Sequence, residues 1–176
     1  MNHFIARLLF VVPVVIGNGA AAAIPEIYHP VAIKPPFSFS ARVFDISPAL
    51  AQARREGKPI FLYLGASDCS TCREYERFLQ MNQIALTEKF SGVIVVDLVT
   101  RTRGRPIQFK VQERRYTFDE FRKLVGDERK FLTYPYYWLL SPDLKQLKQL
   151  SQSMDPYLNV ASHLRLLEPD SGPSRR

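Results

Sequence analysis

The two cysteines of the chain, Cys69 and Cys72, are separated by only two residues, Ser70 and Thr71. Cysteines at this spacing can close a small disulfide ring and reopen it by exchange with the cysteines of another protein. The chain has no third cysteine for a separate structural bridge or for a second resolving thiol. If the protein performs redox chemistry, these two thiols must carry it.

The N-terminus has the three-part layout of a secretory signal. A short basic segment, Met1–Arg7, precedes an apolar run, Leu8–Ile16, and small residues follow at Ala20–Ala23. The apolar run is shorter than the roughly 20 residues that a permanent membrane span needs. We therefore predict a signal peptide over residues 1–23, cut after Ala23, and export to a bacterial periplasm, where thiols tend to be oxidised. An uncleaved membrane anchor is the alternative.

Composition and charge limit the classes of function. The chain that remains after the cut has the size of one domain, and a hydrophobic content of 46% is ample for a core. The formal net charge is +7, and much of the excess lies in residues 101–115, where Glu113 is the only acid. Outside the cytoplasm, nucleic acid is not an expected partner of such a segment. We interpret it as a solvated basic face, with an anionic envelope surface or an acidic protein as alternative ligands. The basic residues are Arg101, Arg103, Arg105, Lys110, Arg114 and Arg115.

Both ends of the exported chain differ in composition from its middle. Residues 24–40 contain four prolines and no helical period, which predicts an extended Pro-rich arm. Residues 168–176 are polar and contain two further prolines, which predicts a disordered tail. A single domain is therefore expected over residues 41–167.

Strand patterns recur along this domain. Two of them are continuous apolar runs, which are typical of central strands that are covered on both faces. A third is shorter, and a fourth continues through a Ser-Pro-Asp turn into a hairpin. In chain order the predicted strands are 42–46, 59–64, 93–99 and the hairpin of 136–140 with 145–150.

Helix signals lie between these strands. Ser47 is expected to cap a helix over residues 48–56, and a second helix begins at the cysteines. Thr117 and Glu120 form a predicted capping box at the start of a third helix. Asp155-Pro156 is expected to cap a fourth. This order of elements predicts the α/β class, with a mixed central β-sheet flanked by helices.

Residues Lys58–Cys72 combine a buried strand, a loop and a cysteine pair at a helix start, and they resemble the active site of the thioredoxin superfamily. Thr133-Tyr134-Pro135, followed by an aromatic strand, is similar to the cis-proline segment of that family. Residues 100–130 resemble the insert of periplasmic thioredoxin-like reductases, where a basic β-ribbon and a short helix precede the proline strand. The resemblance implies a thioredoxin-like sandwich over about Phe44–Leu167, with an insert before the cis-proline strand.

The helix start and the resemblance assign roles to the residues around the pair. Cys69 lies at the expected helix N-terminus, where unpaired N–H groups stabilise a thiolate, so it is the expected attacking thiol. Cys72 is the expected resolving thiol. Asp68 stands where the family usually has tryptophan, and its negative charge opposes thiolate formation. The hydroxyls of Ser70 and Thr71 can donate hydrogen bonds to the Cys69 sulfur.

Three further positions follow from the resemblance. A cis bond between Tyr134 and Pro135 would turn the Tyr134 backbone outward, so these two residues are the expected substrate contacts. Tyr63 occupies the position at which many cytosolic thioredoxins bury a carboxylate that assists proton transfer. The chain therefore lacks a carboxylate at that position.

These patterns predict a periplasmic thiol–disulfide oxidoreductase that reduces disulfides of exported, cysteine-containing proteins. We expect a monomer without cofactor or metal, recharged by a membrane electron-transfer partner. A dithiol oxidase is the alternative in direction, because direction depends on the redox potential and on the partner. A binding protein with a static structural disulfide and a zinc site of the two cysteines with His29 and His163 are the alternatives without exchange chemistry.

Overall fold

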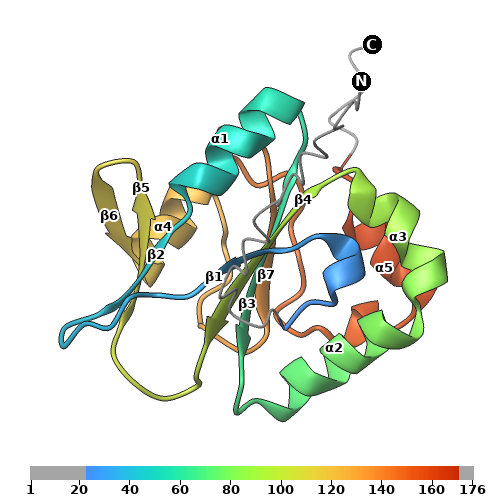
Figure 1. The fold of residues 1–176 in the computed structure, drawn as a ribbon, viewed down its shortest axis with the longest axis horizontal. Helices are drawn as coiled ribbons and strands as arrows, with labels where there is room; N and C mark the ends of the chain where they lie inside the picture. Colours follow the sequence, from blue (N-terminus) through green and yellow to red (C-terminus); the bar gives the residue numbers. More distant parts are fainter. Residues whose placement is uncertain (1–22, 171–176) are drawn as a thin grey trace, which may run out of the picture.

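The computed structural model describes residues 23–170, which form an α/β sandwich (Figure 1). The predicted signal peptide, except for Ala23, and residues 171–176 of the predicted tail lie outside the described residues. Within residues 23–170, none of the helices is long and apolar enough to cross a membrane.

The central sheet has four strands in the order β1-β4-β3-β7. β1 and β3 lie on either side of β4 and run parallel to it, whereas β7 runs antiparallel to β3. The mixed sheet and its two buried central strands confirm the predicted fold class. The strands are β1 (Val31–Ile33), β3 (Ile60–Ala66), β4 (Ile94–Thr100) and β7 (Tyr136–Leu140).

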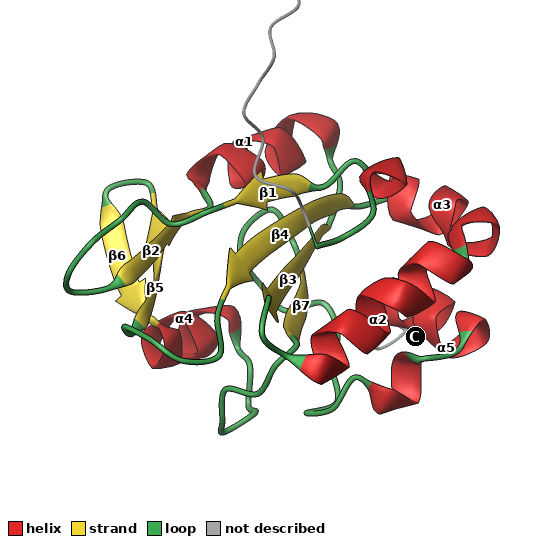
Figure 2. Ribbon diagram, turned by 60° about the horizontal axis from the view of Figure 1, so that its bottom comes forward, coloured by secondary structure: helices red, strands yellow, loops and turns green. Residues whose placement is uncertain are grey.

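Alternate side chains of the central strands enter two different cores. Leu62 and Leu64 of β3 pack with residues of α1, whereas Phe61 and Tyr63 pack with residues of α2, α3 and α5 on the opposite face (Figure 2). This period of two therefore places helices on both faces of the sheet. The helices are α1 (Ser47–Glu56), α2 (Ser70–Met81), α3 (Gln83–Ser91), α4 (Phe118–Val125) and α5 (Val160–Leu166).

A second, three-stranded sheet lies beside α1 and α4 (Figure 1). Its strands, in the order β2-β5-β6, are β2 (Arg42–Asp45), β5 (Ile107–Val111) and β6 (Arg114–Thr117). β5 and β6 form an antiparallel ribbon and α4 follows, which is the arrangement that the resemblance implies for the insert. The capping box of Thr117 and Glu120 is present at the start of α4, as predicted.

The beginning of the predicted arm is part of the folded domain. Ile24 is fully buried, and a 3₁₀ turn, η1 (Glu26–Tyr28), lies against α3. β1 then pairs with β4 and extends the central sheet. The prolines mark the ends of these short elements, because Pro25 caps η1 and Pro30 directly precedes β1. Ile24 and Tyr28 bury against the domain, which the extended-arm prediction did not include.

Two local predictions are wrong. Ile46, not Ser47, is the N-cap of α1, because the Ser47 hydroxyl instead accepts a hydrogen bond from the backbone N–H of Gln112. Residues 145–150 do not form a second hairpin strand in the described chain and meet β7 through one isolated bridge.

The C-terminal helix also differs from its prediction. α5 begins after Asn159, whose side chain accepts a hydrogen bond from the first turn, and Asp155-Pro156 belongs to a separate 3₁₀ turn. The first residue of the predicted tail is held by the domain, since the Glu168 carboxylate lies 2.8 Å from the Lys89 ammonium.

Candidate active site at the cysteine pair

The junction between β3 and α2 holds both cysteines. Cys69 is the N-cap of α2 and Cys72 lies in its first turn. They form a disulfide, with their Cα atoms 5.3 Å apart. Cys69 is 7% exposed and Cys72 is 0% exposed. An incoming partner can therefore reach Cys69 but not Cys72.

Two polar groups of the first turn of α2 are within hydrogen-bond distance of the Cys69 sulfur. The backbone N–H of Cys72 donates to Cys69 Sγ over 3.1 Å, a contact that stabilises a thiolate. Thr71 Oγ1 lies 3.1 Å from the same sulfur and donates to the Tyr134 carbonyl over 2.9 Å. Because a hydroxyl has one proton, Thr71 can donate to the sulfur or to the carbonyl but not to both. Ser70 is exposed and, within residues 23–170, makes no hydrogen bond to either sulfur.

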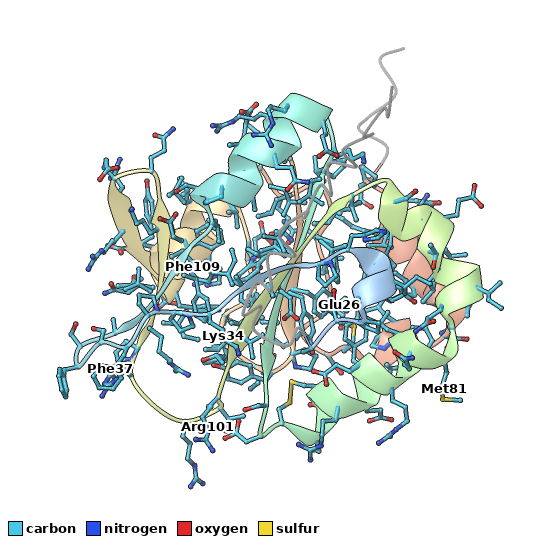
Figure 3. The ribbon with its side chains drawn as sticks, in the orientation of Figure 1. Glu26, Lys34, Phe37, Met81, Arg101 and Phe109 are labelled. Atoms are coloured by element: carbon cyan, nitrogen blue, oxygen red, sulfur yellow. A yellow bond between two sulfur atoms is a disulfide. The ribbon has the colours of Figure 1, made fainter. Side chains whose placement is uncertain are left out.

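Asp68 links the cysteine loop to the start of the insert. Its carboxylate accepts hydrogen bonds from the Thr102 backbone N–H, over 2.7 Å, and from the Thr102 hydroxyl, over 2.9 Å. These bonds lower the pKa of the exposed Asp68 carboxyl, and the bond from the Thr102 backbone N–H has the largest effect. The positive charge of Arg101 lowers the pKa further. Arg101 projects from the same end of the sheet (Figure 3). Asp68 is therefore ionised at neutral pH and places a negative charge one residue before Cys69.

The loop before β7 closes over the disulfide. The Tyr134–Pro135 peptide bond is cis, as the resemblance implies. The Tyr134 side chain packs with Ala66, Cys69 and Cys72 in a small cluster, and burial raises the pKa of its hydroxyl. The Tyr134 carbonyl, which accepts the Thr71 bond, retains a second lone pair for a substrate.

A groove of about 250 Å³ lies beside this loop. It offers both hydroxyl and apolar surface to an extended segment. A larger hollow of about 520 Å³, between α3 and the end of α5, includes neither cysteine. The groove is lined by Thr71, Glu74, Thr133, Tyr134, Pro135, Gln152, Ser153, Met154 and Leu158.

A half-buried acid, Glu76, and a buried acid, Asp97, lie near Tyr63. Tyr63 is fully buried, and its hydroxyl donates to Glu76 Oε1 over 3.5 Å. Asp97 of β4 is the register partner of Tyr63 and is also fully buried. Burial, and then the charge of Asp97, raise the pKa of Glu76 to about 7. Burial likewise raises the pKa of Asp97. Position 63 itself carries no carboxyl group, but Glu76 on the neighbouring helix and Asp97 on the neighbouring strand each place one near the Tyr63 ring.

Glu76 and Asp97 are absent from the site residues predicted above, although the sequence marks both. Glu76 follows Cys72 by four residues, so the two share a face of α2. Asp97 is a charged residue within an otherwise apolar strand, and a buried carboxylate needs a compensating partner. Neither signal gives the three-dimensional proximity, which depends on the β3–β4 register.

The histidines of the zinc hypothesis do not approach the cysteines. His163 is fully buried among aromatic rings, with Nε2 3.4 Å from the Tyr75 hydroxyl, and burial lowers its pKa to about 4. His29 is exposed at the end of η1. Among residues 23–170 no three or more histidine, cysteine, aspartate or glutamate side chains form a group that could hold a metal ion.

A disulfide at the N-terminus of a helix, beside a cis-proline loop, is the arrangement of a thiol-exchange site. A family model described as thioredoxin-like matches residues 42–142, more than half of the chain, and the chain belongs to this family. Among curated proteins, none matches the chain. The family and the disulfide spacing together support thiol–disulfide oxidoreductase chemistry in general.

Proposed function

We propose that the protein works in the periplasm and reduces disulfides of exported proteins, with Cys69 as the attacking thiol. The observation that carries the proposal is the asymmetry of the pair. Cys69 has an exposed edge and a backbone N–H on its sulfur, whereas Cys72 is buried behind it. An attacking thiol needs access and a stabilised thiolate, while a resolving thiol needs only to reach its partner.

The exchange balances as two successive displacements. The Cys69 thiolate attacks one sulfur of the substrate disulfide, and the other substrate sulfur leaves as a thiolate and takes up a proton. Cys72 then loses its proton and attacks Cys69 Sγ, so the mixed disulfide breaks and the second substrate thiol leaves. Two electrons have passed to the substrate. A dithiol of a membrane partner must return two electrons before the next cycle.

The residues around the pair have distinct parts in this proposal. Thr71 turns its hydroxyl from the Tyr134 carbonyl to the Cys69 thiolate when the disulfide opens. The freed carbonyl then accepts a hydrogen bond from the backbone of the substrate, and the groove beside Pro135 takes the flanking residues. Asp68 limits the stability of the thiolate.

Trapping of mixed disulfides tests the assignment of the two thiols. Cys72→Ser should accumulate mixed disulfides with exported proteins, since the resolving step is removed, while Cys69→Ser should accumulate none. The double variant controls for oxidation unrelated to the pair. Equal trapping by both single variants would refute the role of Cys69. If neither variant traps a partner and the folded protein resists reduction by dithiols, the disulfide is structural.

The direction of electron flow is tested by the redox potential of the pair. We expect equilibrium with glutathione or a dithiol buffer at about −270 to −180 mV, between a reducing thioredoxin and an isomerase. The helix N-terminus stabilises the Cys69 thiolate, and Asp68 opposes it, so the dithiol form is only partly favoured. A potential near −120 mV, which is typical of a strong oxidase, would overturn the reductase direction.

A further inference from the structure

The centre of β4 contains a buried carboxylate that is only half satisfied. Asp97 is 0% exposed, and its Oδ1 atom has no hydrogen-bond partner among the described residues. Its Oδ2 atom accepts two backbone hydrogen bonds, from Ala23 N over 2.5 Å and from Ile24 N over 3.0 Å. Both donors come from the first two described residues, more than 70 positions away in the sequence.

Among the residues that the structure describes, the groups that interact with Asp97 carry no positive charge. Tyr63 faces it from β3, and Tyr75 and Glu76 interact with it from α2. Within residues 23–170, Asp97 takes part in no ion pair. A carboxylate without a cationic partner at this depth is unfavourable, since burial penalises its charged form.

We propose that Asp97 is the receptor for the α-ammonium group that forms at Ala23 or Ile24 when the leader is removed. Hydrolysis of the Ala23–Ile24 bond by a signal peptidase consumes one water molecule. The leader departs with the new carboxylate, and Ile24 keeps the new amino group, which is protonated at neutral pH. Hydrolysis one bond earlier does the same at Ala23. The inference rests on the proposed export, and either cut leaves the amine within 3.0 Å of Oδ2.

Residues 23 and 24, at which the new N-terminus would form, are held in place by their surroundings. The Ile24 side chain is 0% exposed and belongs to the core beneath α2 and α3. Pro25 caps η1 directly after it, and β1 pairs with β4 a few residues later, with Ala32 beside Asp97 (Figure 1). Glu26 marks this turn in Figure 3. An ammonium has three N–H bonds in place of one amide N–H, so it can bond Oδ1 as well as Oδ2.

Removal of the leader would also change the acids behind the cysteines. The charge of Asp97 is one of the causes that raise the pKa of Glu76 to about 7. A cation on Asp97 cancels that contribution, so Glu76 becomes more acidic in the processed protein. Glu76 lies one helical turn after Cys72, so processing and the environment of the resolving thiol are linked.

The first test is the N-terminus of the exported protein, read by intact mass and N-terminal sequencing. The expected first residue is Ile24 or Ala23. An N-terminus at any other position, or an uncut leader, overturns the inference.

The second test uses cyanate, which modifies neutral amines, on purified chains that begin at Ile24. In the folded wild type, the α-amine should react about tenfold or more slowly than in Asp97→Asn, because pairing lowers its neutral fraction. Asp143→Asn is the matched control, since it removes an exposed aspartate from another part of the molecule and should leave the rate unchanged. Equal rates in the wild type and Asp97→Asn would contradict the pairing.

A third measurement does not depend on the folding of a variant. The urea midpoint of the chain that begins at Ile24 should exceed that of a chain that carries a short N-terminal extension, because only the first has the cation. Equal midpoints would refute the inference. Mixed-disulfide trapping in the same preparations separates the two proposals. If partners are trapped but the α-amine reacts quickly with cyanate, only this inference is refuted. If the α-amine reacts slowly but no partner is trapped, only the exchange function is refuted.

Discussion

Two buried aspartates, one on each face of the central sheet, have opposite surroundings. Asp127, 3% exposed, accepts hydrogen bonds from Arg129 Nη2 over 2.8 Å, from the Tyr136 hydroxyl over 2.8 Å and from Trp138 Nε1 over 2.7 Å. Asp97, 0% exposed, has backbone donors on one oxygen and no partner for the other among the described residues. The hydrogen-bond partners of Asp127 include the cation Arg129, whereas those of Asp97 come only from the N-terminal residues Ala23 and Ile24 among the described residues.

Their pKa values shift in opposite directions for this reason. Burial alone would raise the pKa of Asp127, but the hydrogen bonds and charge of Arg129 outweigh it and hold the pKa below its usual value. Burial raises the pKa of Asp97, and the Ile24 and Ala23 N–H groups offset only part of the effect. Equal burial therefore does not determine the state of a carboxyl group; the presence of a cation with matching geometry does.

We expect the largest loss of stability when the ion pair between Asp127 and Arg129 is removed. Arg129→Met removes the cation and leaves Asp127 buried with neutral donors, so the free energy of unfolding should fall by about 3–5 kcal/mol. Urea unfolding measures the loss. Arg54→Met is the control, because Arg54 lies 3.8 Å from Asp143 at an exposed position. That variant should change stability by less than about 0.5 kcal/mol. Similar losses in both variants would show that the Asp127 site contributes no more than a surface pair.

The two aspartates should also give opposite pH profiles. In a chain with an N-terminal extension, the raised pKa of Asp97 means that its contribution is present below the unfolded pKa and is lost as pH rises. Asp97→Asn should therefore be near neutral at acid pH and stabilise the extended chain by about 1 kcal/mol at neutral pH. The contribution of Asp127, with its lowered pKa, is present above the unfolded pKa and lost on acidification, so Asp127→Asn should destabilise most at neutral pH. Parallel profiles from urea unfolding at several pH values would contradict the assignment.

The sequence predicts the parts of the fold that depend on neighbouring residues. The apolar runs of β3 and β4, the cysteine pair at the start of α2 and the Thr117–Glu120 capping box are patterns within a few positions. The hydrophobic period and capping chemistry that mark them are local. These elements are also the ones that place Cys69 and Cys72.

The parts that could not be predicted depend on contacts between distant residues. The segment 24–33 reads as an arm because its prolines are visible in the sequence, whereas the pairing of β1 with β4 is not. The Asp97 site joins residues more than 70 positions apart, and the Glu76–Tyr63 contact depends on how α2 packs on β3. Propensity and spacing do not encode such contacts, which tertiary packing decides.

Glu76, a half-buried acid that interacts with Asp97, is an intermediate case. Its pKa of about 7 lies above the ordinary 4.5, so its stabilising contribution is complete below 4.5 and is lost as pH rises through about 7. Glu76→Gln should remove this loss, which we expect to be on the order of 1 kcal/mol after solvent screening. Urea unfolding of the chain with an N-terminal extension, between these pH values, measures it. Glu74→Gln, at an exposed position of the same helix, is the control and should keep the slope of the wild type. If Glu76→Gln keeps that slope as well, the raised pKa is refuted.

Asp68 is the exposed counterpart of the two buried aspartates, and it should give the smallest effect. Asp68→Asn removes a negative charge beside Cys69, so the pKa of the Cys69 thiol should fall by some tenths of a unit and at most about one unit. The amide can keep both contacts, since its oxygen can accept from the Thr102 N–H and its nitrogen can donate to the Thr102 hydroxyl. The loop is therefore expected to keep its position, which leaves the charge as the main change.

Thiolate absorbance against pH measures this shift, in a Cys72→Ser background so that only one thiol titrates. Because water and ions reach Asp68, the difference in Cys69 pKa with and without the Asp68→Asn substitution should shrink as salt is raised. The buried sites should respond to salt far less, since counterions do not enter them. A rise in the Cys69 pKa, or a shift that salt leaves unchanged, would show that Asp68 acts through the loop geometry and not through its charge.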